Sequence, residues 1–339
     1  MTESAPANVL ISLSEARQQA ACAVTQTLRG APAPVSEMTS HLTAAQGKGI
    51  RSLLLIYCSM DAEGLVPQDA VQAAAAVELF HLATLVHDDV IDDAPLRRGI
   101  PTIQYNYGKK RAVICGDYLL CLAASKAAPL HTSYQGHSSL LATYMSALSR
   151  VCQGELNQFV NNRNLELGIP GYLRIIMGKT ASLFYASALS GALIARYTQA
   201  QALRLARFGR YLGIVFQIVD DCKDYEFSEG VTLKTGRKDI AEGVVTLPLI
   251  CAFRSSPELR ELAGQAFDNA SAAELLVMAV RDSGGIRQSR ELAVRFADKA
   301  KSMLAGFPEE KKRLLLELLE SLTNHQDHES LIANSETST

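Results

Sequence analysis

The chain has 339 residues, 48% of them hydrophobic and 20% charged, and carries a net charge of −2. This length can bury one large core or two modest ones, and the lack of any segment dominated by lysine and arginine argues against nucleic-acid binding. The seven cysteines are scattered and form no C-x-x-C pair, which argues against a disulfide framework and against a zinc site.

Helical patterns dominate the chain, because apolar residues recur at i, i+3 and i+4 in segments too long for strands. The expected helices span 13–28, 68–92, 115–127, 140–162, 171–195, 200–224, 241–253, 271–281, 289–305 and 309–322. Glycine and proline residues fall between them, and no fixed-period repeat or flexible linker divides the sequence. We therefore expect an all-α fold in which residues 1–339 form a single helical domain, with disordered tails at 1–8 and 325–339.

The N-terminus is polar and lacks the basic-then-apolar order of a secretory signal. The apolar runs are shorter than the roughly 18 residues that cross a membrane. These features predict a cytoplasmic protein without a transmembrane segment.

Two segments, 68–92 and 207–219, are apolar nearly all round. A helix without a polar face belongs in the centre of a bundle. Each of these two segments runs directly into a cluster of aspartates, and this coincidence is the first indication of function.

The first cluster reads Asp88-Asp89-Val90-Ile91-Asp92-Asp93 and is followed by Pro95. The proline predicts that the helix ends here, so that four carboxylates share its last turn. Aspartate is unfavourable at the negative end of a helix dipole, and carboxylates one turn apart repel by roughly 3 kcal/mol at an effective dielectric constant of about 20. Asp88 and Asp92, at i and i+4, share one face and can bind the same cation.

The second cluster, Asp220-Asp221-Cys222-Lys223-Asp224, repeats this D-D-x-x-D pattern. Both clusters offer only hard oxygen ligands, which suit Mg²⁺ ions that keep several waters and share substrate phosphates. One such cluster could equally be a solvated helix end. Two clusters, each after an apolar helix, favour a metal site.

Basic residues accompany both clusters. Arg97 and Arg98 directly follow the first, and Lys48 and Arg51 lie upstream in the segment 46–51. Lys179 precedes Thr180 within an expected helix, and the loop after the second cluster contains Lys234, Arg237 and Lys238. Taken singly, each would be read as a surface charge. Together, cations beside di-aspartate motifs predict a bound polyanion, most simply a diphosphate.

From about Gly47 to Pro248 the chain resembles the trans-prenyltransferases, the polyprenyl diphosphate synthase family. The two largest matches are HDDVIDDAPLRRG at 87–99 and FQIVDDCKD at 216–224; smaller ones are GDYL at 116–119, GELNQ at 154–158, KTA at 179–181 and TLP at 246–248. The resemblance implies a large helical bundle of the isoprenoid synthase type with its active site in a central cavity. It also implies a homodimer and a Mg²⁺-dependent head-to-tail condensation of an allylic diphosphate with isopentenyl diphosphate.

The resemblance further implies a role for each site residue. The metal ligands would be Asp88, Asp92 and Asp220, supported by Asp89, Asp221 and Asp224. The allylic diphosphate would be held by Arg97, Lys179, Gln217 and Lys234, with Thr180 positioning it. Isopentenyl diphosphate would be held by Lys48, Arg51, His81 and Arg98. The residues closest to the chemistry would be Asp88, Asp92, Asp220, Arg97 and Lys179. Helical spacing agrees with these roles, since His81, Asp88 and Asp92 form one stripe; His81 alone would be read as a core histidine.

Three positions depart from the family pattern. Gly49 and Ser52 stand where a basic residue and a proline are common, and Val244 stands where many short-chain members have lysine. We interpret these departures as subfamily variation.

Product length is expected to follow the depth of an apolar tunnel below Asp88. Ala83 and Thr84 lie one turn before this aspartate and are small, which predicts an open tunnel and a medium or long product. Phe80, or residues 119–122 of a neighbouring helix, could close the tunnel further down. Alternatively, Ala83 simply packs against another helix. The loop 228–238 is a candidate lid over the site, because the allylic cation must be shielded from water.

Three alternatives remain open. A terpene cyclase shares the bundle and the first motif, but its second motif usually mixes Asn, Ser or Thr with Glu, and it needs no Lys48 and Arg51. A di-iron bundle requires two E-x-x-H motifs, and the sequence offers only the pair of Glu78 and His81. The third alternative is one subunit of a heteromeric prenyl diphosphate synthase.

Overall fold

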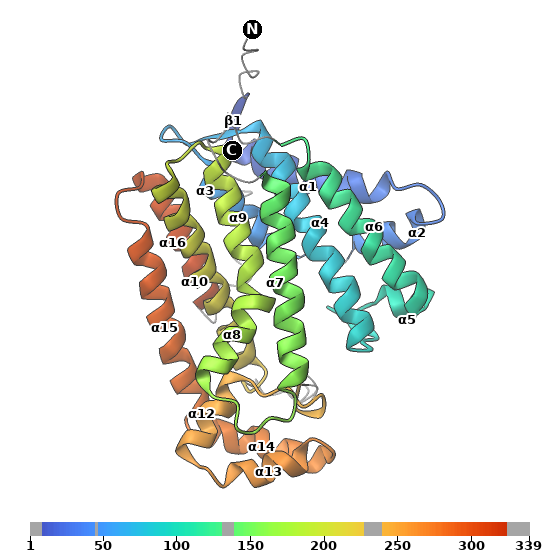
Figure 1. Ribbon diagram of the computed structural model, residues 1–339, viewed down its shortest axis with the longest axis vertical. Helices are drawn as coiled ribbons and strands as arrows, with labels where there is room; N and C mark the ends of the chain where they lie inside the picture. Colours follow the sequence, from blue (N-terminus) through green and yellow to red (C-terminus); the bar gives the residue numbers. More distant parts are fainter. Residues whose placement is uncertain (1–8, 45–46, 131–138, 227–238, 324–339) are drawn as a thin grey trace. The chain divides into compact units, whose positions relative to one another are not determined.

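The computed structural model describes residues 9–44, 47–130, 139–226 and 239–323, and these form helices joined by turns and two short hairpins (Figure 1). The expected all-α class is confirmed. The predicted tails at 1–8 and 325–339 and the predicted lid at 228–238 lie outside the described residues.

The helices of the first half of the chain are α1 Leu13–Arg29, α2 Ser36–Leu42, α3 Ile50–Ser59, α4 Gln68–Ile91, α5 Ile103–Tyr107, α6 Lys109–Ala127 and α7 Leu140–Val160. Those of the second half are α8 Ile169–Lys179, α9 Ala181–Ile194, α10 Gln199–Lys223, α12 Leu247–Ser255, α13 Leu259–Ala266, α14 Ala270–Asp282, α15 Gly285–Met303 and α16 Glu309–Thr323. The antiparallel hairpins pair β1 Leu10–Ser12 with β2 Leu65–Pro67, and β3 Leu96–Arg97 with β4 Ile100–Pro101.

The chain forms two compact units. The first comprises residues 1–146, 186–206 and 306–315, and the second comprises 147–185, 207–305 and 316–339. The division passes through α7, α9, α10 and α16. A single domain over 1–339 stays a prediction.

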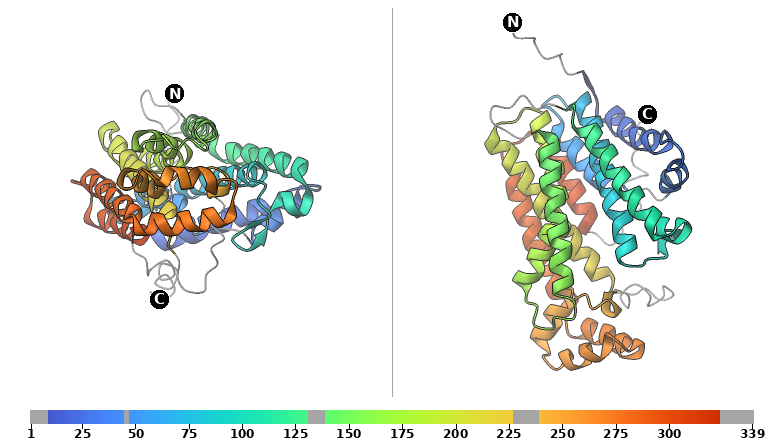
Figure 2. Two further views of the ribbon diagram at one scale, coloured as in Figure 1. Left: turned by 90° about the horizontal axis from the view of Figure 1, so that it is seen from below. Right: turned by 45° about the vertical axis from the view of Figure 1, so that its right-hand side comes forward.

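Helix α4 is the central element of the first unit. It packs against α1, α3 and α6, and Figures 1 and 2 show α6 running along it. Residues around its whole circumference are buried, including the four alanines 73–76, whose small side chains let the neighbouring helices approach closely. The predicted central position of this segment is therefore confirmed. Within the described residues α4 alone is long and apolar enough to cross a membrane, but 67% of its most apolar window is buried inside the protein, as expected for a core helix.

Glycines allow close helix packing in both units. A Cβ on Gly191 of α9 would overlap the Leu55 carbonyl oxygen of α3 in the first unit. In the second unit, a Cβ on Gly213 of α10 would lie 2.7 Å from Cα of Ala181. The apolar part of α10 is buried, as predicted, and α13 lies beside α14 (Figures 1 and 2).

Some element boundaries differ from the expectation. The predicted helix 171–195 is two helices, which are separated at Thr180, where φ is −107° and departs from the usual helical value of about −63°. The helix expected at 241–253 begins only at Leu247, after Gly243 with a φ of 78° and with Pro248 in its first turn. Short helices α2, α3, α5 and α13 were not predicted.

Candidate active site

The first aspartate cluster lies at the end of α4, as predicted. Asp88 and Asp89 belong to the last turn, and Asp92 is the C-cap, whose backbone N–H donates to the Asp88 carbonyl at 2.8 Å. Asp89 is buried and accepts from Arg97 Nε at 2.8 Å. Asp88 and Asp92 are half-buried. Asp89 is thus committed to an ion pair inside the protein, whereas Asp88 and Asp92 keep part of their surface exposed.

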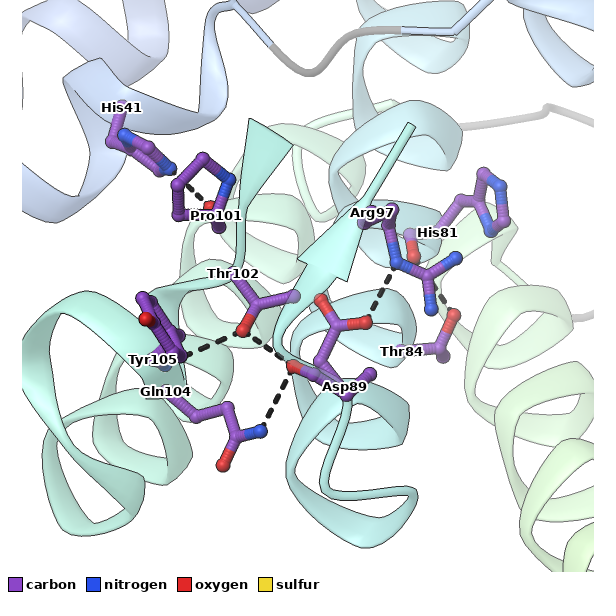
Figure 3. A network of polar contacts seen from close by, with 10 residues as sticks. His41, His81, Thr84, Asp89, Arg97, Pro101, Thr102, Gln104 and Tyr105 are labelled. Carbon is purple, nitrogen blue, oxygen red and sulfur yellow. Dashed lines mark hydrogen bonds and ion pairs between the residues drawn. The ribbon is translucent and has the colours of Figure 1, made fainter. Parts of the chain in front are cut away.

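A two-residue hairpin places Arg97 and Arg98. Strands β3 and β4 pair around Arg98 and Gly99, which have φ values of 52° and 77°, as both central residues of a type I′ turn require. The base of the hairpin is fixed by hydrogen bonds, shown in Figure 3: His41 Nε2 donates to the Pro101 carbonyl at 2.6 Å and Thr102 Oγ1 to the Ala94 carbonyl at 2.7 Å. The cation that pairs with Asp89 therefore comes from a rigid turn.

Three of the four residues expected to hold isopentenyl diphosphate lie close enough in the first unit for their charges to affect one another. Burial lowers the pKa of His81 well below its usual value, and the charges of Arg51, Arg97 and Arg98 lower it further, so the imidazole is neutral at pH 7. Burial lowers the pKa of Arg51 to about 10, and Arg98 adds to this effect. The fourth residue, Lys48, is exposed. It follows Gly47, where a Cβ would lie 2.6 Å from an Arg98 guanidinium nitrogen, so this glycine permits the arginine to lie against the backbone.

The second aspartate cluster lies at the end of α10 in the second unit. Asp220 is exposed and forms an ion pair of 3.7 Å with Lys223, whereas Asp221 is buried. Burial and, after it, the charges of neighbouring carboxylates such as Asp239 raise the pKa of Asp221 to about 7 and that of Asp224 to about 8, although hydrogen bonds from Tyr172 and Gln217 act to lower the pKa of Asp221. The chain thus gathers carboxyl groups at this helix end whose ionisation is unfavourable without a nearby positive charge.

A hydrogen-bonded chain runs through this cluster. Thr180 Oγ1 donates to Gln217 Oε1 at 2.6 Å, and Gln217 Nε2 donates to Asp221 Oδ1 at 2.8 Å. Tyr172 Oη donates to the second Asp221 oxygen at 2.6 Å. Gln217, predicted to lie at the allylic diphosphate, is therefore bonded directly to a predicted metal ligand, and Thr180, predicted to lie there too, is connected to that ligand through Gln217.

Lys179 is held by the matched segment 154–158. Its Nζ lies 2.8 Å from Glu155 Oε2 and donates to Gln158 Oε1 at 3.2 Å. Helices α7 and α8 approach so closely here that a Cβ on Gly154 would overlap the Lys179 backbone nitrogen, and one on Gly178 would lie 2.9 Å from the Arg150 carbonyl oxygen. The two glycines thus allow the helix contact that sets the position of Lys179.

The predicted chain-length residues all lie in the first unit. Phe80 and Ala83 are fully buried in α4, and Thr84 donates to the His81 carbonyl at 2.8 Å. The Phe80 ring packs at 5.3 Å on the ring of Tyr144 from α7. Of the residues proposed on the neighbouring helix, Leu119 is fully buried.

Sequence reasoning assigned no role at this site to four residues that contact or perturb it: Glu78, which was weighed only as a di-iron ligand, and Glu155, Tyr172 and Asp239. Glu155 stood inside a matched segment, so a signal for it existed. Tyr172 is 49 residues from Asp221, and no local pattern could have connected the two. The predicted Lys234 lies outside the described residues.

The chemistry of the donors fits magnesium. Within the described ranges, no three carboxylate, imidazole or thiol groups converge closely enough to bind an ion by themselves. Mg²⁺ usually binds through one or two carboxylates and completes its octahedral shell with waters and substrate phosphates. Paired, partly exposed carboxylates such as Asp88 and Asp92 suit that mode of binding.

Comparison with known proteins identifies relatives along most of the chain. The family model for polyprenyl synthetase matches residues 32–281. The chain is 34% identical over 297 residues to heptaprenyl diphosphate synthase component 2 of Geobacillus stearothermophilus, covering 87% of this chain and 91% of that protein. It is 29% identical over 301 residues to octaprenyl diphosphate synthase of Haemophilus influenzae, covering 88% of this chain and 86% of that one.

Solved structures show the same fold. Heptaprenyl diphosphate synthase from Staphylococcus aureus superposes with a TM-score of 0.83 at 27% identity, covering 92% of this chain and 98% of that one. Polyprenyl synthase from Caulobacter crescentus, complexed with calcium and isoprenyl diphosphate, superposes with a TM-score of 0.80 at 30% identity, covering 91% and 95%.

Proposed function

Because the chain belongs to the polyprenyl synthetase family, whose members are prenyltransferases, we propose that it is a medium- or long-chain polyprenyl diphosphate synthase. It would condense an allylic diphosphate with isopentenyl diphosphate, head to tail, to give a longer all-trans product. The observation that carries this proposal is the pair of D-D-x-x-D motifs at the ends of α4 and α10, each accompanied by cationic side chains in its own unit.

Magnesium would be bound by Asp88, Asp92 and Asp220, with Asp89, Asp221 and Asp224 supporting them. When bound, the metal supplies Lewis-acid stabilisation of the negative charge on the departing diphosphate. The calcium in the Caulobacter complex supports a divalent cation in this family. Arg97 and Lys179 would add fixed positive charge to the same leaving group, and Lys179 would exchange Glu155 for a phosphate oxygen to do so.

The second substrate would be held by Lys48, Arg51, His81 and Arg98. Because the His81 imidazole is neutral at pH 7, its ring N–H can donate to a diphosphate while its other ring nitrogen accepts. The double bond of isopentenyl diphosphate then attacks the allylic cation, and loss of a proton to the released diphosphate completes the new unit. Apolar side chains of α4 would exclude water from the cation.

A medium or long product is supported by the small residues Ala83 and Thr84 before Asp88 and by the names of the relatives, which include heptaprenyl and octaprenyl diphosphate synthases. We also propose a cytoplasmic homodimer that contacts membranes transiently when it releases its product. The relative from Geobacillus is named as a component. This name favours, as the second candidate function, one subunit of a heteromeric synthase.

The test is to incubate the purified protein with Mg²⁺, radiolabelled isopentenyl diphosphate and, separately, each common allylic diphosphate primer. Products are dephosphorylated and separated by length. A ladder that ends at one discrete size is the expected result. A cyclic hydrocarbon or alcohol would instead identify a terpene cyclase, and turnover only after addition of a second chain would identify a heteromeric subunit.

A further inference from the structure

Glu78 is an acidic residue in a basic part of the first unit. It lies on α4 one turn before His81, among the side chains proposed to hold isopentenyl diphosphate. A carboxylate beside a diphosphate site weakens anion binding by simple charge repulsion. Glu78 therefore needs a different physical explanation, and its contacts provide one.

The first contact completes the N-terminus of α3. This helix begins after Gly49, which has a φ of 62° and no side chain to cap the exposed amides, although the first amides of a helix need acceptors from outside it. Ser52 N donates to Glu78 Oε1 at 2.9 Å, so the acceptor comes from α4. The family resemblance places proline at this position, and proline has no N–H; the bond therefore requires a residue other than proline, as Ser52 is here.

The second contact is electrostatic. The carboxylate of Glu78 favours the charged form of the partly buried Arg51 guanidinium, while the nearby charge of Arg98 opposes it. Arg51 follows Gly49 by two residues in the same helical turn that Glu78 caps. One carboxylate thus acts on both the backbone and the cation of this turn.

We propose that Glu78 is a positioning residue for isopentenyl diphosphate: it caps α3 through Ser52 and holds Arg51 in place to receive the diphosphate. The proposal rests on the proposed function, because it assigns Glu78 to that same substrate site. A positioning role and simple charge repulsion predict opposite changes in isopentenyl diphosphate binding when Glu78 is removed. If Glu78 only repels the substrate, its removal tightens isopentenyl diphosphate binding; if it positions Arg51, its removal weakens binding.

The test measures steady-state kinetics of Glu78→Ala, Glu78→Gln and the wild type, varying each substrate in turn. For Glu78→Ala, KM for isopentenyl diphosphate should rise about tenfold or more, and KM for the allylic diphosphate should change less than about twofold. Glu78→Gln keeps an amide oxygen that can accept from Ser52 but loses the charge, so its effect should be intermediate. Glu63→Ala, which removes an exposed carboxylate of the same unit, is the matched control and should leave both KM values unchanged.

A double-mutant cycle tests the route through the Ser52 amide. Ser52→Pro removes this N–H, whereas Ser52→Ala retains it. Glu78→Ala should therefore raise KM for isopentenyl diphosphate less in the Ser52→Pro background than in the Ser52→Ala background. Equal effects in both backgrounds would show that the cap does not transmit the effect.

The outcomes distinguish failure of the positioning role of Glu78 from failure of the proposed function. An unchanged or lowered KM for isopentenyl diphosphate in an active Glu78→Ala enzyme overturns the positioning role. If the melting temperature shows that Glu78→Ala does not fold, the isosteric Glu78→Gln is used instead. An unchanged or lowered KM for isopentenyl diphosphate in that variant likewise overturns the positioning role. A wild type that elongates no primer overturns the proposed function itself.

Discussion

Tyr172 donates a 2.6 Å hydrogen bond to Oδ2 of Asp221, while Gln217 donates to Oδ1 at 2.8 Å. Both oxygens of this buried carboxylate are therefore held by side chains of α8 and α10, and its orientation is fixed. Asp220 and Asp224 lie on the same helix end, to either side of it in sequence. Partners of this kind, which hold a carboxylate next to a metal, tune the affinity of a metal site without binding the ion themselves.

Tyr172→Phe should therefore lower the apparent affinity of the enzyme for Mg²⁺ and have a smaller effect on its stability. Loss of a partner that orients a ligand typically lowers metal affinity by about 10- to 100-fold. We expect the Mg²⁺ concentration for half-maximal condensation to rise within that range, measured by titration of activity with the metal. Tyr144→Phe is the matched control, because Tyr144 is also a buried tyrosine but donates to a backbone carbonyl of α4. Equal shifts in the two variants would assign the effect to packing.

Gly154→Ala should displace Lys179. The added methyl would overlap the Lys179 backbone nitrogen and lie 2.8 Å from the Gly178 carbonyl carbon, so α7 and α8 must separate. Overpacking of this kind costs about 1–3 kcal/mol of stability, and KM for the allylic diphosphate should rise because this lysine moves. Gly168→Ala is the control, since its Cβ meets only Pro170 at 3.7 Å. A stable Gly154→Ala enzyme with unchanged allylic KM would remove Lys179 from the proposed substrate site.

Ala83→Phe should shorten the product. Ala83 is fully buried in α4, five residues before Asp88, which corresponds to about 7.5 Å along a helix. A phenyl group there would block a growing chain after fewer condensations than in the wild type. Product length is read by chromatography after dephosphorylation, with Ala83→Ser as a control that adds little volume. A folded Ala83→Phe enzyme with wild-type product length would mean that this residue only packs against another helix.

The parts of the molecule that could be predicted from sequence are those encoded locally. The all-round apolar character of α4 predicted its burial, and Pro95 correctly predicted that the helix ends close to the aspartates. Helix α3 was missed because its run of apolar residues from Leu53 to Tyr57 has no helical periodicity to distinguish it from a buried strand. Consequently Arg51 was noted from sequence only as one of the basic residues that accompany the aspartate clusters, and its assignment to isopentenyl diphosphate came from the family resemblance.

Long-range contacts explain the remaining differences. The break at Thr180 has no proline or glycine at the position itself, and the structure shows Thr180 bonded to Gln217, 37 residues away. The cap that Glu78 gives to Ser52 spans 26 residues. Such contacts depend on how helices pack together, and one sequence carries no period or motif that reports them.

Lys311 should make stability depend on pH in a direction that is unusual for lysine. It is fully buried, and its Nζ donates to Tyr197 Oη at 2.6 Å and to the Cys58 carbonyl at 3.1 Å. Burial lowers the pKa of Lys311 to about 8 from its ordinary 10.5. Between these two values the unfolded chain binds more protons than the folded one, so the free energy of unfolding rises with pH. Below about pH 8 the full cost of burying the ammonium is present.

Comparison of the wild type with Lys311→Met isolates this contribution, because the other titrating groups are common to both proteins. From pH 7.5 to pH 9, the wild type should gain roughly 1 kcal/mol of unfolding free energy relative to the variant, measured by urea denaturation at both pH values. The range stops at pH 9 because the pKa of the buried Cys58 thiol, raised by burial to about 12 from 9.0, makes stability fall with pH above that point. A difference that stays constant with pH would mean that Lys311 remains charged in the folded protein throughout this range. In that case its hydrogen bonds to Tyr197 and Cys58 offset the cost of burial and keep the pKa of Lys311 close to its ordinary value.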